Sequence, residues 1–464
     1  MSLLITNARI VTSTDDYIAD VYCEHETITR IAKGISPASC AAGTEAIDAN
    51  GKLLFPGFID PHVHVYLPFM GTYAKDTWET ASRAALVGGT TTLIEMICPG
   101  KGDEPLGAFD TWLGKARGAS ACDFSFHMGV TRWDAQAEAQ LREIVSRGIR
   151  SFKVFLAYKG ALGVDDRELY HALKLARELG VVVTAHCENE TLIAEKQAEL
   201  LAAGRREPRW HEVSRPASVE AAGVSHLMAF AEQTGAEVYI VHTSCEDAVL
   251  AAQRGISRGV RAHIETVIPY LTLDSTYAEK AGDNGFEGAK YVMSPPIRAR
   301  RHQDFLWDAL RARTIATVAT DHAPFDYKGQ KEMGRFPGSD FTRIPNGIPS
   351  VEHRVDLLYT HGVATGRIDL HTFVDAASTR AARVFGLKNK GSIAVGADAD
   401  LVIYDPAHRG VISAKTHHMA TDYSGWEGWE LKGRSSVVTV RGRVMVRDGR
   451  FVGDTKHGRL VPRS

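Results

Sequence analysis

Five residues that can bind metal ions stand at the ends of apolar, strand-like runs of this chain. Two of them, His62 and His64, lie in the segment 60–64, where alternation along an extended backbone places both side chains on the same side. The others end three further runs and are His186, His242 and Asp321. Imidazole and carboxylate groups are common zinc ligands. A single histidine of this kind is usually a core or surface residue, but the whole set predicts a metal centre.

A lysine lies inside another run of the same kind. Lys153 stands in the segment 151–156, which otherwise suits a buried strand. A buried ammonium is costly unless it is paired or neutralised, and it has no lone pair for a metal. Reaction of the neutral amine with carbon dioxide would give a carbamate, an anion whose two oxygens can bridge two cations. The alternative is a lysine that reaches solvent or pairs with a glutamate.

Short apolar runs alternate with longer helical stretches through the middle of the chain, which is typical of a parallel sheet. Helices are expected over Asp166 to Leu179 and Ser218 to Thr234. The repeats predict an α/β fold, a (β/α)8 TIM-like barrel, in which active sites lie at the C-terminal ends of the strands. The expected strands are Leu54 to Asp60, Thr91 to Met96, Asp123 to Met128, Ser151 to Leu156, Val181 to His186, Glu237 to His242, Val260 to Glu265 and Ile315 to Asp321.

The two ends of the chain resemble each other more than they resemble the middle. Both are rich in short runs of β-branched residues separated by turns, so we expect them to pair into one small β-sandwich domain. The predicted strands are Leu3 to Val11, Tyr17 to Glu24, Thr27 to Ile31, Leu401 to Tyr404 and Ser436 to Val446. The expected domain limits are 1–53 for the N-terminal part of the sandwich, 54–385 for the barrel, and 386–464 for the C-terminal part of the sandwich together with the tail.

Composition excludes several classes of protein. The formal net charge of −2 gives no reason to expect binding to nucleic acid or to an anionic membrane. No apolar run approaches the roughly 20 residues that span a bilayer, and the N-terminus lacks the features of a signal peptide. The six cysteines form no CxxC pair, which favours reduced thiols and a cytoplasmic location. The segment 460–464 resembles a truncated protease-cleavage tag, although it could equally be native, and it is left out of the fold prediction.

Several motifs in order along the chain resemble the dihydropyrimidinase/hydantoinase branch of the amidohydrolase superfamily. The resemblance covers nearly the whole length. The histidine pair alone is moderately specific, whereas the ordered set is highly specific. The segments that carry it are 57–64 (GFIDPHVH), 88–92 (GGTTT), 151–153 (SFK), 186–189 (HCEN), 241–242 (VH), 294–296 (SPP), 321–322 (DH) and 344–347 (IPNG).

The resemblance implies a centre with two divalent metal ions, most simply Zn²⁺, with Mn²⁺ or Co²⁺ as alternatives. One ion would be bound by His62, His64 and Asp321 and the other by His186 and His242. Carboxylated Lys153, formed from CO2 or bicarbonate, and a hydroxide would bridge the two ions. Relatives of this kind are commonly homotetramers, which we expect here too.

Three further residues match substrate-binding positions of the family. Tyr158 would help to hold the oxygen of the attacked carbonyl, and backbone groups of Ser294 and Asn346 would bind the amide of the ring. Without the resemblance, Tyr158 would be read as packing at the barrel mouth. Ser294 and Asn346 would be read as ordinary turn residues beside proline and glycine.

The predicted activity is hydrolysis of a cyclic amide. Two metal ions roughly 3.5–4 Å apart lower the pKa of a shared water and polarise the carbonyl. Asp321 is placed to take the proton from the bridging hydroxide as it attacks, and to pass this proton to the departing nitrogen. The expected product from a hydantoin or a dihydropyrimidine is an N-carbamoyl amino acid.

The substrate is predicted from the loop after the histidine pair. Dihydroorotases usually carry an arginine where this chain has Tyr66, and the nearest cation in the flanking loops is Lys159. The segment 66–70 is apolar, which favours an apolar or small ring substituent over a charged one. The loop could instead be a lid that only excludes water. Allantoinase and cyclic-imide hydrolase remain alternatives, as does a non-enzymatic scaffold relative. Mononuclear deaminases of the superfamily are disfavoured because they lack the bridging lysine.

Overall fold

The computed structural model describes residues 2–464 and contains a closed parallel barrel, as predicted. Its eight strands pair in chain order, and the ring closes where Asp321 N donates to His62 O (3.0 Å) and His64 N donates to His322 O (2.8 Å). The barrel strands are β6 (Phe58–Val63), β9 (Thr90–Ile97), β10 (Asp123–Gly129), β11 (Ser151–Phe155), β12 (Val182–His186), β13 (Val238–Ile240), β14 (Ala262–Val267) and β15 (Thr317–Ala319).

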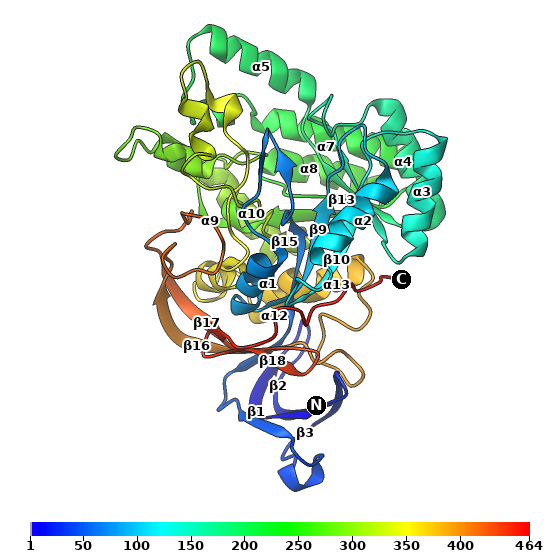
Figure 1. Cartoon of the computed structure of the whole chain (residues 1–464), viewed down its shortest axis with the longest axis vertical. Helices are drawn as coiled ribbons and strands as arrows, with labels where there is room; N and C mark the ends of the chain where they lie inside the picture. Colours follow the sequence, from blue (N-terminus) through cyan, green and yellow to red (C-terminus); the bar gives the residue numbers. More distant parts are fainter. Residues whose placement is uncertain (1) are drawn as a thin grey trace.

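Helices cover the outside of the barrel (Figure 1). The helix α4 (Asp166–Leu179) shows how the sequence sets such a helix: Asp165 and Glu168 form a capping box at its start, and left-handed Gly180 ends it. The other long helices are α1 (Trp78–Val87), α2 (Pro105–Ala116), α3 (Ala135–Ser146), α5 (Glu190–Ala202), α7 (Ala217–Thr234), α8 (Glu246–Ser257) and α10 (Arg300–Arg311). Shorter ones are α6 (Trp210–Val213), α9 (Ile268–Thr272), α11 (Arg354–Leu358), α12 (Leu370–Val374) and α13 (Arg380–Val384).

The two chain ends form a second, mostly antiparallel sheet below the barrel in the view of Figure 1. The ends meet where β5 pairs with β16, with Leu54 opposite Ile403. The strands of this sheet are β1 (Ser2–Val11), β2 (Asp16–Glu24), β3 (Thr27–Ala32), β4 (Glu45–Asp48), β5 (Leu53–Pro56), β16 (Leu401–Val411), β17 (Glu430–Val440), β18 (Arg443–Arg447) and β19 (Arg450–Phe451).

Two predicted strands are each divided in the structure. The run 54–60 belongs partly to β5 in the outer sheet and partly to β6 in the barrel. The chain changes sheet at Gly57, where an added Cβ would lie 2.2 Å from Thr91 Oγ1. The run 436–446 is a hairpin of β17 and β18, which turns at left-handed Arg441 and Gly442. In both cases a glycine inside the run marks the point where the chain turns.

The segment 460–464, which the fold prediction left out, packs against the barrel in the structure. It continues a stretch that runs along the barrel: Val461 N donates to Phe124 O (2.8 Å) and Arg463 N donates to Gly148 O (2.8 Å). The Arg463 side chain is buried and donates to Ser151 Oγ (2.9 Å). Among residues 2–464, no helix combines the length and the apolar character needed to cross a membrane.

Candidate metal centre

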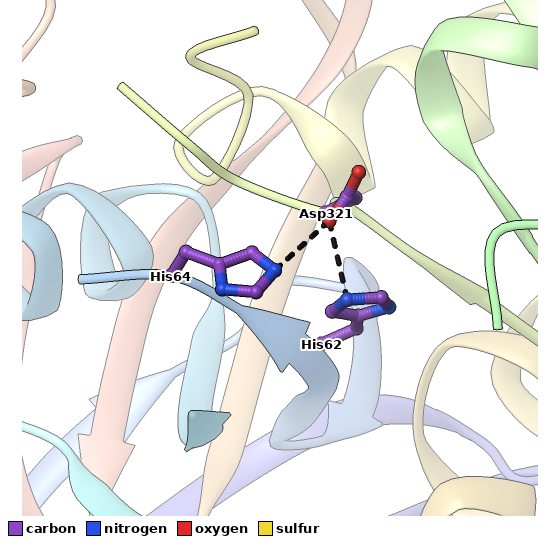
Figure 2. Close-up of side chains that lie close together, drawn as sticks. All are labelled: His62, His64 and Asp321. Carbon is purple, nitrogen blue, oxygen red and sulfur yellow. Dashed lines mark ion pairs between the residues drawn. The ribbon is translucent and has the colours of Figure 1, made fainter. Parts of the chain in front are cut away.

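Three of the predicted ligands converge at one end of the barrel (Figure 2). His62 lies on β6, His64 directly follows it, and Asp321 follows β15. The Oδ1 atom of Asp321 lies 3.1 Å from His62 Nε2 and 3.2 Å from His64 Nε2. The three side chains are buried, and one ligand atom of each lies within 4.8 Å of the others. This arrangement fits a single metal ion.

The second pair of predicted ligands lies beside the first. His186 ends β12 and His242 follows β13, and His186 Nδ1 lies 3.0 Å from His242 Nε2. The ring centroids of His62 and His242 are 5.3 Å apart, so the two sets form one cluster. The structure brings all four histidines and Asp321 to the C-terminal ends of the barrel strands, where the sequence places them.

Lys153 completes the cluster from β11. Its side chain is fully buried and lines the same small cavity as His64, His186, His242 and Asp321. Nζ has no hydrogen-bond partner among the described residues. Burial lowers the pKa of Lys153 to about 8, which favours the neutral amine that reaction with carbon dioxide requires. Neither sequence alternative, a lysine that reaches solvent or one paired with a glutamate, describes this environment.

Hydrogen bonds on the outer side of the histidines leave unprotonated nitrogens facing inward. His62 Nδ1 lies 2.7 Å from Glu265 Oε1, and His186 Nε2 lies 2.9 Å from Glu188 Oε2. When each carboxyl group accepts this hydrogen bond, the proton of its histidine lies on the outer nitrogen. Burial also lowers the pKa of His62 and of His242, so both imidazoles are neutral. Neutral imidazoles with inward lone pairs, a carboxylate and an unpartnered amine fit two divalent cations bridged through a modified lysine.

Several site residues have a strained backbone. Tyr158, His242 and Asp321 have positive φ angles of 63°, 40° and 51°. Such conformations are unfavourable for residues other than glycine and concentrate at functional sites. At these residues the backbone leaves the extended conformation of a strand, and the side chains point toward the cluster.

The predicted substrate-binding residues border the cluster. Tyr158, Ser294 and Asn346 line the inner cavity of about 50 Å³, and Asn346 Nδ2 lies 3.4 Å from Tyr158 Oη. Burial raises the pKa of Tyr158, so its phenol stays protonated and can donate a hydrogen bond. The structure therefore gathers all of the predicted site residues in one place.

A larger outer cavity of about 950 Å³ adjoins the inner one. Phe69, Cys98, Tyr158, Leu162 and Asn346 line both. The loop after the histidine pair forms the hairpin of β7 (Pro68–Phe69) and β8 (Thr72–Tyr73). Its residues contribute to both cavities, so the loop is placed to contact a ring substituent as well as to exclude water.

Sequence reasoning missed three charged residues around the cluster. Glu265 and Glu188 orient ligand histidines, and Arg215 pairs with Glu188 at 2.6 Å. Arg215 also lies 5.7 Å from the Tyr158 ring and lines the outer cavity, whereas Lys159 lines neither cavity. Glu265 lies in a buried strand, the same signal that identified Lys153. Arg215 comes from a loop distant in sequence and gave no signal of its own.

Comparison with known proteins agrees with this geometry. The model of the Amidohydrolase family matches residues 53–445. The chain belongs to the amidohydrolase family. It is 43% identical to a D-hydantoinase of Geobacillus stearothermophilus, over 100% of this chain and 97% of that protein. It is 36% identical to the dihydropyrimidinase of Rattus norvegicus, over 99% of this chain and 88% of that protein.

Solved structures of the same family are similar throughout. A D-hydantoinase from Thermus sp. superposes with a TM-score of 0.96 at 57% identity, covering 99% of both chains. An L-hydantoinase from Arthrobacter aurescens superposes with a TM-score of 0.89 at 28% identity, also over 99% of both chains. The barrel and outer sheet of this amidohydrolase are thus the arrangement that both enzymes share.

Proposed function

We propose that this amidohydrolase opens the ring of a 5-substituted hydantoin or a dihydropyrimidine and releases an N-carbamoyl amino acid. The observation that carries the proposal is the cluster at the barrel mouth, in which two sets of inward-facing ligands flank buried Lys153. The relatives named D-hydantoinase and dihydropyrimidinase support the same activity.

Two divalent ions would be held by this cluster. His62, His64 and Asp321 would bind one, His186 and His242 the other, and carboxylated Lys153 would bridge them. When bound, the ions lower the pKa of a water and polarise the carbonyl of the substrate. Histidine, carboxylate and carbamate ligands favour Zn²⁺, with Mn²⁺ or Co²⁺ as alternatives.

Residues of the chain itself transfer the proton and bind the ring. Asp321 takes a proton from the attacking water and returns it to the departing amide nitrogen, which is a poor leaving group until it is protonated. The phenol of Tyr158 donates to the carbonyl oxygen as negative charge develops there. Backbone groups at Ser294 and Asn346 hold the amide, so that the carbonyl faces Asp321.

The cavity walls favour an apolar substituent. Leu67, Phe69 and Leu162 line the inner cavity. Arg215 lies 5.7 Å from the Tyr158 ring, but its contact with Glu188 at 2.6 Å neutralises it. The other cation that lines the outer cavity, Lys101, lies 3.5 Å from Glu168. A substrate carboxylate would therefore be desolvated without a free partner, which is costly. We expect dihydroorotate to be a poor substrate, and we expect the D hand of a hydantoin to be preferred, as the relatives' names suggest.

The test is a substrate panel under one metal condition. The panel comprises dihydrouracil, both hands of 5-alkyl and 5-aryl hydantoins, allantoin, dihydroorotate and cyclic imides, compared by kcat/KM. Hydantoins or dihydrouracil should be opened much faster than dihydroorotate. A preference for dihydroorotate would refute the pocket argument, and a preference for allantoin would show that the loop is only a lid. A fully metal-loaded protein that opens no compound would support a scaffold role. The homotetramer and the cytoplasmic location stay predictions.

A further inference from the structure

Glu265 on β14 is a fully buried carboxyl group that touches ligands of both proposed metal positions. Its Oε1 atom lies 2.7 Å from His62 Nδ1 and also accepts the backbone N–H of His242 at 2.8 Å. Its second oxygen accepts the hydroxyl of Tyr239 at 2.8 Å. One oxygen atom is thus shared by a ligand of the first ion and a ligand of the second.

The contact with His62 sets the direction of a lone pair. When His62 Nδ1–H donates to Glu265, Nε2 carries no proton and its lone pair faces inward, where Asp321 Oδ1 lies 3.1 Å away. Loss of the acceptor would allow the ring to rotate or to take the other tautomer. Partners of this kind typically change metal affinity or activity by about 10–100-fold.

The contact with His242 acts on the backbone. His242 has a φ of 40°, a conformation that non-glycine residues adopt only when their surroundings impose it. The bond from its N–H to Glu265 helps to hold this conformation, which brings His242 Nε2 to 3.0 Å from His186 Nδ1. Without it, the strand end would relax and the second set of ligands would separate.

Glu188 provides a contrast within the same site. It contacts the ring of His186 at 2.9 Å and is held by Arg215 at 2.6 Å, and it makes no hydrogen bond to a ligand of the first position among the described residues. Glu188 therefore contacts a ligand of one metal position, whereas Glu265 contacts ligands of both.

We propose that Glu265 is a positioning residue that couples the two metal positions, so that its loss weakens both together. This inference rests on the two-metal centre proposed above. It concerns hydrogen-bond acceptance by Oε1, not the charge of the carboxylate.

The test compares Glu265→Leu with Glu265→Gln. Leucine has a similar volume but no acceptor, whereas glutamine retains an acceptor oxygen for both N–H groups and can donate to Tyr239. Glu237→Leu is the matched control, because Glu237 pairs with His263 at 2.8 Å near the opposite end of the same strands. Zinc-loaded proteins are dialysed against increasing chelator, and bound zinc per chain is measured by elemental analysis.

The parent, Glu237→Leu and Glu265→Gln should retain about two ions up to similar chelator concentrations. Glu265→Leu should lose both ions together at a roughly 10–100-fold lower chelator concentration. If Glu265→Leu fails to fold, Glu265→Asp replaces it, because its shorter side chain cannot reach both N–H groups at once; it should also lose both ions early.

The outcomes separate the two proposals. A parent that binds at most one ion would contradict the two-metal centre itself. The coupling alone would be overturned if the parent binds two ions and the Glu265 variant also binds both at parental affinity. It would likewise be overturned if the variant binds only one ion and binds it with unchanged affinity. Early zinc loss from Glu265→Gln, with its fold intact, would show that charge rather than acceptance is responsible.

Discussion

Replacing Asp321 with asparagine separates its two proposed roles, metal ligand and proton carrier. Asp321 Oδ1 lies 3.1 Å from His62 Nε2 and 3.2 Å from His64 Nε2, so one oxygen is placed as a ligand. Asparagine keeps the shape and one oxygen but cannot accept a proton at neutral pH. Asp321→Asn should therefore impair proton transfer more than metal binding.

The expected loss follows from that assignment. A general acid–base group typically contributes about 10²–10⁴-fold, or roughly 3–5 kcal/mol of the barrier. We expect kcat to fall by at least about 100-fold while KM changes only a few-fold, because the ring is held by other residues. Asp308→Asn, at an exposed position on α10, is the control and should retain parental kinetics.

The assay measures kcat and KM for a 5-substituted hydantoin and the bound metal of the same samples. The proton-carrier role is refuted if Asp321→Asn retains two metal ions and more than about a tenth of the parental kcat. If the variant loses its metal as well, the lost activity belongs to ligation.

Four further outcomes are expected. Purified protein should hold about two divalent ions per chain, and at most one after reconstitution with zinc and bicarbonate would contradict the bridged centre. Lys153→Ala should lose nearly all activity and regain part of it with short carboxylic acids, whereas density that ends at the amine in a fully active preparation would exclude the carbamate. Tyr158→Phe should lower kcat by about 10²–10³-fold, as removal of one donor to a developing oxyanion does, and unchanged kcat would remove Tyr158 from that role. Burial raises the pKa of Asp356 from 3.8 to about 7, so the parent loses about 4 kcal/mol of stability as pH rises through this range and the buried carboxyl group ionises. Asp356→Asn should therefore have a higher Tm than the parent at pH 8 but not at pH 4. Equal Tm differences at both pH values would contradict the pKa shift.

Much of the fold could be predicted from the sequence because parallel barrel strands are buried on both faces. Such strands appear as continuous apolar runs, and seven of the eight were predicted to within a few residues at each end. The exceptions have a common cause. The runs 54–60 and 436–446 were each predicted as one strand, although each contains a glycine at which the chain changes sheet (Gly57) or turns (Gly442). Hydrophobicity outlined the strands, whereas these glycines mark the points where a strand ends.

The candidate ligands could also be predicted, because parallel strands deliver their C-terminal ends to one rim of the barrel. Any polar residue that ends such a strand lies near the others, whatever the distance along the chain. Lys153 stood out for a related reason, since a charged residue in a buried strand requires an explanation.

What only the tertiary structure decided is which groups surround those ligands. The sharing of Glu265 between His62 and His242, and the pairing of Glu188 with Arg215, join residues 23 to 203 positions apart. Hydrogen bonds act over about 3 Å, and no local pattern encodes which distant side chain will come within that range. The sequence therefore determined the chemistry that the barrel mouth offers, and the packing of the whole chain determined how those groups are oriented.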